Sequence, residues 1–336
     1  MKRIILAAAA AFITLAGTAQ ERSWEYWKNS DKYLSDQAEE LLGYVDGTLL
    51  AYPPTPKPSV ERRLAFTALD AVLHETRYDD SKQFHDFLDK RLQRVARQLA
   101  EKAKPGLNIY KLYDDGFIVK TGKLTAGFDI CGNRRNTKVI PDHLLKELVE
   151  HCDIIFISHK HQDHADPLVV KIAGEAGIPV FGPADFECEG FTALHPDGPE
   201  NMVLTARNGY RLPVLVLPGH QVKLLNNIYI LTMPGGKTIA HFGDQDLEAD
   251  NEWLFKSPEL LTKRLDVMII NGWNPELEKT VMSFNPKVVL SGHENEMFHG
   301  IDHREALWLT QYKFDKLAFP MPAYTMVWGE YFRYSK

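Results

Sequence analysis

The stretch His159-Lys160-His161-Gln162-Asp163-His164 decides the fold. It directly follows the apolar run DIIFI at 153–157, which we expect to form a buried strand. Four side chains with metal-binding atoms lie within these six residues, so a turn after the strand can direct the first two to one side and the last two to another. Neutral imidazole suits zinc and its first-row neighbours, while carboxylate suits a hard or borderline dication. The stretch therefore predicts one loop that serves two metal ions.

Three further apolar runs each lead into a metal-binding side chain. The run 215–219 precedes His220, the run 238–243 precedes Asp244, and the run 288–292 precedes His293. A glycine stands directly before each of the three, which lets the backbone turn tightly. Strand ends along one edge of an α/β sheet are where binding sites are commonly built. We therefore expect these three side chains beside the histidine-rich loop.

Strands and amphipathic helices alternate along the chain after Gly106. Strands are expected at 116–120, 127–130, 177–181, 266–270 and 287–290. Helices are expected to be capped by Asp142 and Asp166, the latter with Gly174 as its stop, and to open at Ser257-Pro258. This alternation predicts one α/β layered domain over about residues 106–336.

The order H-x-H-x-D-H, G-H, G-D and G-H resembles the metallo-β-lactamase superfamily, over roughly residues 106–336. The resemblance implies an α/β fold of the four-layer αβ/βα sandwich type, with metal ions at one edge of two facing sheets. It implies that His159, His161 and His220 bind a first metal ion. It also implies that Asp163, His164 and His293 bind a second one, and that Asp244 bridges the pair. Asp129 stands where the family often has a carboxylate that hydrogen-bonds a ligand imidazole.

The chemistry that this ligand set implies is hydrolysis. Two divalent ions, zinc by first expectation and manganese or iron as alternatives, hold a bridging water whose pKa falls from ~15.7 towards roughly 7. The resulting hydroxide attacks a carbonyl carbon or a phosphorus, and the metal ions stabilise the charge that develops. Asp163 is the expected catalytic residue, because the family pattern has it orient the nucleophile or protonate the leaving group.

Within the superfamily, segments 113–130 and 220–244 look most similar to the ascorbate-6-phosphate lactonase-like branch, which includes the N-acyl phosphatidylethanolamine phospholipase D type. Gln162 stands where the phospholipase type usually has tyrosine, and the sequence near the site contains no basic cluster that would indicate a phosphate pocket. Neither the lactonase substrate nor the phospholipase substrate is therefore expected for this chain. The expected substrate is an ester, lactone or phosphodiester of a small molecule or lipid.

The ligand set also bears on other functions that occur on the same fold. True β-lactamases as a group lack the bridging aspartate matched here by Asp244, and the 49 residues from Asp244 to His293 leave no room for the inserted domain of the RNA-cleaving group. An iron-dependent oxidoreductase of the sulfur dioxygenase kind stays open, because its ligands are the same. A binding protein with a decayed site is disfavoured, because the whole ligand set is present.

The sequence indicates the residues that contact the substrate less clearly than it indicates the metal ligands. Asn271 and Trp273 follow a strand at the level of the site, and the indole is a candidate pocket lining. His299 and His303 are expected to be solvated surface histidines. His241 is expected to point away from the metal ions, because side chains alternate along a strand.

The first nineteen residues have the composition of a signal peptide. Lys2 and Arg3 precede an apolar run at 4–15, and small residues follow at 17–19. The run is shorter than the ~20 residues that span a bilayer. We therefore expect cleavage after Ala19, export to the periplasm or beyond, and no transmembrane segment in the mature chain.

Residues 20–105 are expected to form a helical N-terminal extension, interrupted by the proline-rich stretch 51–58. Ser59 is a candidate cap for a helix whose apolar side carries Leu64, Leu69, Val72 and Leu73. A second helix over 81–104 places Phe84, Leu88, Leu92 and Val95 at helical spacing. A plain structural extension is expected, with a cap, a lid or a dimer surface as alternatives.

Composition excludes little else. A formal charge of −6 gives no footprint for DNA or RNA, so no nucleic-acid partner is expected. Cys131, Cys152 and Cys188 allow at most one disulfide, whose pairing stays open along with the oligomeric state.

Overall fold

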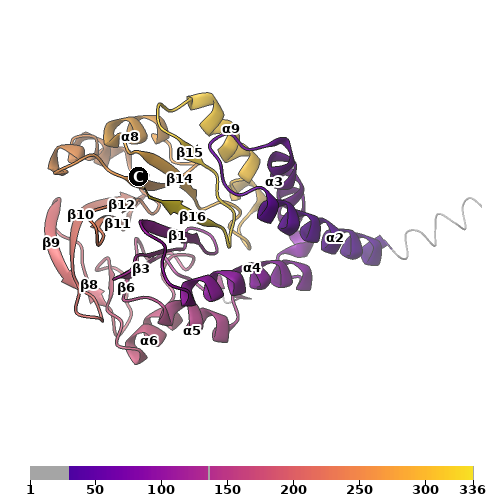
Figure 1. Cartoon of the computed structure of the whole chain (residues 1–336), viewed down its shortest axis with the longest axis horizontal. Helices are drawn as coiled ribbons and strands as arrows, with labels where there is room; N and C mark the ends of the chain where they lie inside the picture. The colour runs from indigo at the N-terminus through magenta and orange to yellow at the C-terminus, as the bar shows by residue number, and fades with distance from the viewer. Residues whose placement is uncertain (1–29, 135–136, 336) are drawn as a thin grey trace, which may run out of the picture.

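A computed structural model of the chain describes residues 30–134 and 137–335 (Figure 1). The expected signal peptide at 1–19 lies outside the described residues. Among the helices of the described part, none combines the length and apolar character needed to cross a membrane.

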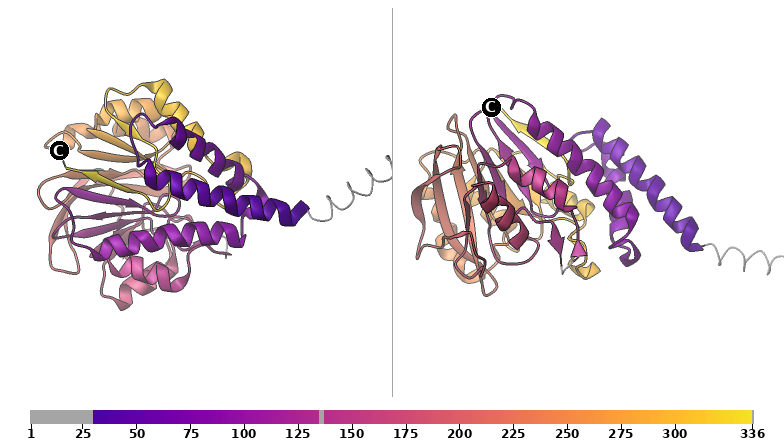
Figure 2. Two further views of the ribbon diagram at one scale, coloured as in Figure 1. Left: turned by 45° about the vertical axis from the view of Figure 1, so that its right-hand side comes forward. Right: turned by 90° about the horizontal axis from the view of Figure 1, so that it is seen from below.

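Two seven-stranded sheets face each other (Figure 2). The first contains, in spatial order, β16 (Tyr331–Tyr334), β1 (Leu107–Lys111), β2 (Phe117–Lys120), β3 (Thr125–Phe128), β6 (Ile154–Phe156), β7 (Val180–Gly182) and β8 (Thr192–Ala193). The second contains β15 (Ala323–Tyr324), β14 (Val288–Gly292), β13 (Val267–Asn271), β12 (Thr238–His241), β11 (Leu224–Thr232), β10 (Arg211–Gln221) and β9 (Glu200–Thr205). A small hairpin, β4 (Asn133–Arg134) and β5 (Thr137–Lys138), stands apart from both sheets.

Strand β13 shows why the sheets are buried on both faces. Val267 and Ile269 belong to the hydrophobic cluster between the two sheets. Met268 and Ile270 point the other way and belong to the cluster under the helices. Because successive side chains alternate between faces, a run of uninterrupted apolar residues fits a central strand covered on both sides.

Helices cover the outer face of each sheet (Figures 1 and 2). The first sheet is covered by α4 (Lys82–Ala100), α5 (Asp142–Glu150) and α6 (Pro167–Glu175). The second is covered by α7 (Asn251–Leu254), α8 (Leu277–Phe284) and α9 (Leu307–Leu317). Short 3-10 turns lie at η1 (Thr76–Tyr78), η2 (Glu248–Asp250), η3 (Ser257–Leu260) and η4 (Ile301–His303). The expected four-layer αβ/βα sandwich is thereby confirmed.

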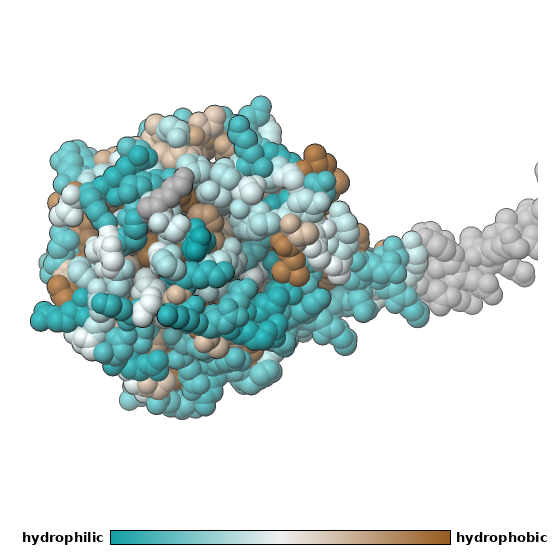
Figure 3. Space-filling model, viewed as in Figure 1, coloured by the Kyte–Doolittle hydropathy of each residue, from teal (hydrophilic) through white to brown (hydrophobic). Residues whose placement is uncertain are grey.

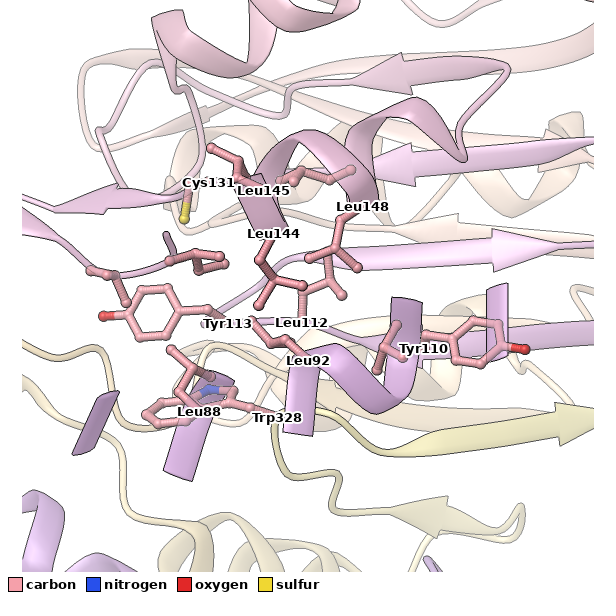
Figure 4. Close-up of a cluster of buried hydrophobic side chains, with 14 of the residues drawn as sticks. Leu88, Leu92, Tyr110, Leu112, Tyr113, Cys131, Leu144, Leu145, Leu148 and Trp328 are labelled. Carbon is pink, nitrogen blue, oxygen red and sulfur yellow. The ribbon is translucent and has the colours of Figure 1, made fainter. Parts of the chain in front are cut away.

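The N-terminal helices α2 (Ser30–Ala51), α3 (Val60–Leu73) and α4 pack on this sandwich, and α2 projects from its side (Figure 1). Figure 4 shows Leu88 and Leu92 of α4 beside Leu144 of α5 and Trp328 near the C-terminus. All four side chains are buried. Helix α4 therefore forms part of the outer helical layer, although the sequence placed it in an extension that ends at residue 105.

A buried ion pair also ties the extension to the end of the chain. The Arg62 guanidinium on α3 donates to both carboxylate oxygens of Glu330, each at 2.6 Å, and to the carbonyl of Thr325 at 3.0 Å. The side chains of Arg62 and Glu330 are 1% and 4% exposed. Because the pair is bidentate and buried, removal of either side chain would leave the other charge buried without a partner and would destabilise the fold.

The expected helix caps are confirmed at Ser59 and Asp166, while three other details of the helices differ from the expectation. Ser59 accepts from the Arg62 amide and Asp166 from the Leu168 amide, as N-caps should. Helix α5, however, starts at Asp142 with Pro141 as its N-cap. Helix α6 runs one residue past Gly174, and Leu64 is 56% exposed on the outer side of α3.

The three cysteines are free thiols, with Cys131 and Cys152 buried. The surface seen in Figure 3 is largely hydrophilic, and its hydrophobic residues form separate small patches. Scattered apolar residues of this kind are normal on a protein surface.

Candidate metal centre

Parallel strands bring the metal-binding side chains to one edge of the sandwich. In the first sheet β3 and β6 are parallel, so Asp129 and the loop 159–164 follow strands that end side by side. In the second sheet β12, β13 and β14 are parallel, so Asp244 and His293 also follow neighbouring strand ends. Because the sheets face each other, these loops converge at one place.

Three groups of side chains in the described part of the chain could each hold a metal ion, and two of them contain the expected ligands, while the third consists of Asp115, Asp129 and His164. Of the first two, one consists of His159, His161 and Asp244, and the other of Asp114, Asp163, His164 and His293. Within each group the ligand atoms all lie within 4.8 Å of one another. Apart from Asp114, all of these residues are ligands that the resemblance implied. They divide between the two ions as the resemblance implied, and Asp244 lies with His159 and His161.

The spacing between donor atoms fits metal coordination. Nε2 of His164 lies 3.2 Å from Asp163 and 3.5 Å from Asp244, and Nε2 of His293 lies 3.3 Å from Asp163 and 3.5 Å from Asp244. Two ligand atoms that share a tetrahedral zinc ion at about 2.1 Å lie about 3.4 Å apart. The Nε2 atoms of His159, His164 and His293 are buried and have no hydrogen-bond partner. Since buried polar atoms are normally satisfied, the cluster fits divalent metal ions.

The carboxylate of Asp129 fixes the orientation of two of these imidazoles. Nδ1 of His164 donates to Asp129 Oδ2 at 2.8 Å, which leaves Nε2 as the metal-binding atom. The Ser158 hydroxyl donates to the same oxygen at 2.6 Å and lies 3.1 Å from Nδ1 of His159. Asp129 therefore occupies the position that the resemblance implied, directly behind the ligands.

His220 is the ligand that the structure does not gather with the rest. It belongs to none of the three potential metal-binding groups found in the described part of the chain. Its Nδ1 lies 3.2 Å from both carboxylate oxygens of Asp250, which again leaves Nε2 as the available ligand atom. Its role as a ligand stays a prediction.

Asp244 is held from two sides. Its backbone amide donates to Asn226 at 3.1 Å, and Asn271 donates to its Oδ1 at 2.7 Å. Gly243 precedes it with φ of 52°, and a Cβ there would come within 2.4 Å of Ser158. Only glycine fits this close approach. Asn271 thus contacts the metal-ligand cluster through Asp244, and its expected substrate-binding role stays a prediction.

Sequence reasoning missed the pair Asp114 and Asp115, which lie between β1 and β2. Both carboxylates are buried, and none of their four oxygens has a hydrogen-bond partner. Asp114 Oδ1 lies 3.5 Å from Nδ1 of His293, and Asp115 Oδ2 lies 3.5 Å from Nε2 of His241. The signal in the sequence was two adjacent acids at the end of an apolar strand.

His241 lies off the metal cluster, as strand alternation predicted. Its ring stacks on Phe128 with centroids 5.0 Å apart, and its Nε2 donates to the carbonyl of Asp115 at 3.0 Å. It packs between the sheets and supports the Asp114-Asp115 turn.

Charges in the cluster are strongly coupled. Burial, followed by the neighbouring His164, lowers the pKa of His159 to about 3, so its imidazole is neutral at physiological pH. Burial opposes protonation of His164, yet Asp244 and Asp163 raise its pKa well above the usual value. The pKa of Asp163 is correspondingly low, because the attraction of His164 outweighs burial. A metal ion that binds here therefore displaces a proton.

A cavity of about 590 Å³ opens beside this cluster. Asp163, Asp244 and His293 face it from the metal-ligand side. Trp273 lines it, in agreement with the sequence expectation, and its ring centroid lies 5.7 Å from that of His293. His299 and His303 line it as well, and the His303 side chain is 67% exposed, as expected of a surface histidine.

The helical extension supports the wall of this cavity. Asp70 on α3 accepts from the amides of Leu307 and Trp308, the first residues of α9, and from the side chain of Asn295. A carboxylate at a helix N-terminus satisfies amides that lack helical partners. The segment from His293 to α9 is therefore held in place by the N-terminal helices.

No protein-family model matches the chain, and no curated protein matches it. Among solved structures, it resembles Igni18, a novel metallo hydrolase from the hyperthermophilic archaeon Ignicoccus hospitalis, with a TM-score of 0.50 and 18% identity over 68% of this chain and 98% of that one. It also resembles the isothiocyanate hydrolase from Delia radicum gut bacteria, with a TM-score of 0.50 and 12% identity over 68% of this chain and 99% of that one. A third structure, the diiron β-hydroxylase CmlA from Streptomyces venezuelae, has a TM-score of 0.48 and 13% identity over 70% of this chain and 55% of that one.

The chain therefore shares its fold with these two hydrolases, and its membership of the metallo-β-lactamase superfamily, expected from the order of its motifs, stays a prediction. The branch within the superfamily stays a prediction.

Proposed function

We propose that the chain is an exported hydrolase that uses two divalent metal ions, zinc by first expectation, to cleave an ester, lactone or phosphodiester. One observation carries the proposal. Buried imidazole nitrogens of His159, His164 and His293 converge without hydrogen-bond partners on the carboxylates of Asp163 and Asp244, at the inner end of a cavity. Such a donor set binds a metal ion and leaves room for substrate.

The proposed division of the site follows from its contacts. His159 and His161, with His220 as the predicted third imidazole, would hold one ion, and Asp163, His164 and His293 would hold the other. Asp244 lies within 3.5 Å of imidazoles from both sets and would serve both. The ions, when bound, lower the pKa of a water and polarise the bond that is cleaved.

The protein's own groups then position and transfer protons. Asp163 faces the cavity, where its carboxylate orients the attacking water and afterwards passes a proton to the leaving group. Asp129 and Ser158 keep the Nε2 atoms of His164 and His159 directed at the site. Asn271 prevents the Asp244 carboxylate from rotating.

Export is part of the proposal and rests on Lys2, Arg3 and the apolar run that follows them. Sequencing of the mature N-terminus from protein secreted by a bacterial host tests it. The expected first residue is Gln20, and recovery of intact Met1 from exported protein would reject cleavage.

The activity is tested with a panel of a lactone, a carboxylic ester, a phosphodiester, a thioester and a β-lactam, assayed before and after chelation. Turnover of at least one ester-type substrate that disappears on chelation and returns with added zinc supports the proposal. Oxygen consumption on a thiol-derived substrate by iron-loaded protein, without any hydrolysis, would instead support the oxidoreductase alternative.

A further inference from the structure

The segment that begins at the predicted ligand His293 has an unusual backbone. His293, Asn295 and Phe298 all have positive φ, at 65°, 58° and 64°. Residues other than glycine rarely adopt this left-handed conformation, because their Cβ then lies close to a carbonyl oxygen. Such residues persist only where the surrounding structure holds them, and they gather at functional sites. The segment 293–298 therefore depends on contacts from outside itself.

One side of the segment is held by the first sheet. The ammonium group of Lys111, at the end of β1, pairs with the carboxylate of Glu294, and the two side chains are 0% and 1% exposed. The hydroxyl of Tyr113 accepts from the backbone amide of Met297 at 2.8 Å. These contacts fix the chain on either side of Asn295.

The other side is held by the N-terminal helices, and Asn295 makes the contact. Its side-chain amide donates to Oδ1 of Asp70 in α3 at 2.8 Å. Its own Oδ1 accepts from Nε2 of His74, the residue that caps the end of α3, at 3.0 Å. Asn295 and Asp70 are both buried. Asn295 therefore uses both ends of its side-chain amide to bind α3.

Asparagine suits this position for two separate reasons. It tolerates the left-handed backbone better than most residues, and its amide supplies the donor that Asp70 needs and the acceptor that His74 needs. The Asp70 carboxylate also accepts from the amides of Leu307 and Trp308, at 3.1 and 3.0 Å, so the start of α9 is held by the same group. Apolar contacts alone would dock the extension without this buried polar network, which destabilises the fold unless each member is paired.

We propose that Asn295 is a positioning residue for His293, and that the N-terminal helices thereby set the affinity of the second metal position, formed by Asp163, His164 and His293. The inference rests on the proposed metal centre and goes beyond it, because no predicted ligand lies in the helical extension. Asn295 is two residues from His293, so relaxation of the backbone at Asn295 changes the direction of the imidazole. Nε2 of His293 lies 3.3 Å from Asp163, and a displacement of ~1 Å is enough to disturb such a site.

The coupling between the helices and the metal ion is reciprocal. Whatever the docked helices add to the affinity for the ion, the bound ion adds to the stability of their docking. A metal ion at the second position is therefore expected to protect the backbone amides of α3 against hydrogen exchange.

The first test measures the affinities of the two positions separately. Cadmium NMR of the loaded protein gives one resonance for each position, and the resonance lost in His293→Ala identifies the second one. Asn295→Gly keeps a residue that favours positive φ and removes both side-chain hydrogen bonds. In competition with a chelator, this variant is expected to bind cadmium about tenfold more weakly at the second position and unchanged at the first. Wild-type affinity at the second position of folded Asn295→Gly overturns the inference.

A matched control removes a hydrogen bond of the extension that does not reach the segment. The hydroxyl of Tyr78 donates to the carbonyl of Leu34 at 2.8 Å, and Tyr78→Phe removes this bond. Tyr78→Phe is expected to keep both cadmium affinities. Equal weakening in Tyr78→Phe and Asn295→Gly overturns the role of Asn295, because any loosening of the extension would then have the same effect.

Hydrogen exchange of the wild type gives a second test that needs no variant. Cadmium loading is expected to slow exchange of the α3 amides about fivefold or more beyond its effect on α8, whose apolar residues belong to a different cluster. Equal effects on α3 and α8 contradict the coupling.

The inference and the proposed function fail separately. Two cadmium resonances in the wild type, with the second affinity unchanged in Asn295→Gly, overturn the inference and leave the metal centre standing. Selective loss at the second position, without turnover of any ester, lactone or phosphodiester, supports the inference and contradicts the hydrolase. A wild type that binds no cadmium contradicts both.

Discussion

Nδ1 of His164 lies 2.8 Å from Oδ2 of Asp129, in a buried position where the same oxygen also accepts from the Ser158 hydroxyl. The contact fixes which imidazole nitrogen carries the proton, and so keeps Nε2 available for metal. Both side chains are fully buried.

Replacement of Asp129 by asparagine is therefore expected to weaken metal affinity by about 10–100-fold, because the amide does not favour the required tautomer. Competition with a chromophoric chelator measures the affinity. The exposed Asp142, which pairs with Lys138 on the surface, provides the control Asp142→Asn. Wild-type affinity in a folded Asp129→Asn protein would contradict the role given to Asp129.

Asp114 is expected to do for His293 what Asp129 does for His164, because its Oδ1 lies 3.5 Å from Nδ1 of that imidazole. Asp114→Asn should lower the occupancy of one metal ion more than the other, as measured by metal content after dialysis against a weak chelator. The neighbouring Asp115 faces His241 instead, so Asp115→Asn is the matched control. Equal losses in the two variants would show that the turn, rather than the Asp114 carboxylate, is what matters.

Arg62 is expected to be essential for the attachment of the N-terminal helices. Arg62→Ala leaves the Glu330 carboxylate buried and unpaired, and should lower the free energy of unfolding by about 3–5 kcal/mol. Its neighbour Arg63 pairs with Asp315 on the surface, where the side chains are 45% and 37% exposed. Arg63→Ala should cost about 1 kcal/mol or less. Urea unfolding of both variants checks the contrast, and similar losses would contradict it.

Asp266 should make stability depend on acid pH. Burial raises the pKa of its carboxyl, but hydrogen bonds from Lys287 and Thr238 outweigh burial and lower the pKa from 3.8 to about 2. A carboxyl whose folded-state pKa is lowered stabilises the protein above its unfolded pKa, and that contribution is lost as pH falls through the folded pKa. The stability difference between wild type and Asp266→Asn should therefore shrink from pH 4 towards pH 2. A difference that stays constant over this range would contradict the shift.

The sequence predicted the sandwich and most of the cluster because both rest on local patterns. Apolar runs that end in glycine and a ligand mark parallel strands, and parallel strands end at one edge whatever the details of packing. The packing of α4 could not be predicted, because an amphipathic helix does not reveal which apolar surface it covers. The segment 20–105 therefore looked like an appendage.

Long-range contacts explain the other differences. Asp114 and Asp115 are remote in sequence from His293 and His241, and nothing local distinguishes them from turn acids. Asn271 was placed at the correct level, but its contact with Asp244 depends on strand order. His299 and His303 line the cavity because Asp70 and Arg304 hold their loop against it, a relationship that joins residues more than 200 positions apart.

The metal content of the purified mature protein tests the central claim most directly. Elemental analysis is done on protein supplied with zinc, manganese and iron in turn, and Asp244→Ala is analysed alongside. Close to two ions per chain are expected in the wild type, with loss of at least one in the variant. Fewer than one ion per chain under every supply, or full occupancy of both positions in Asp244→Ala, would contradict the paired centre.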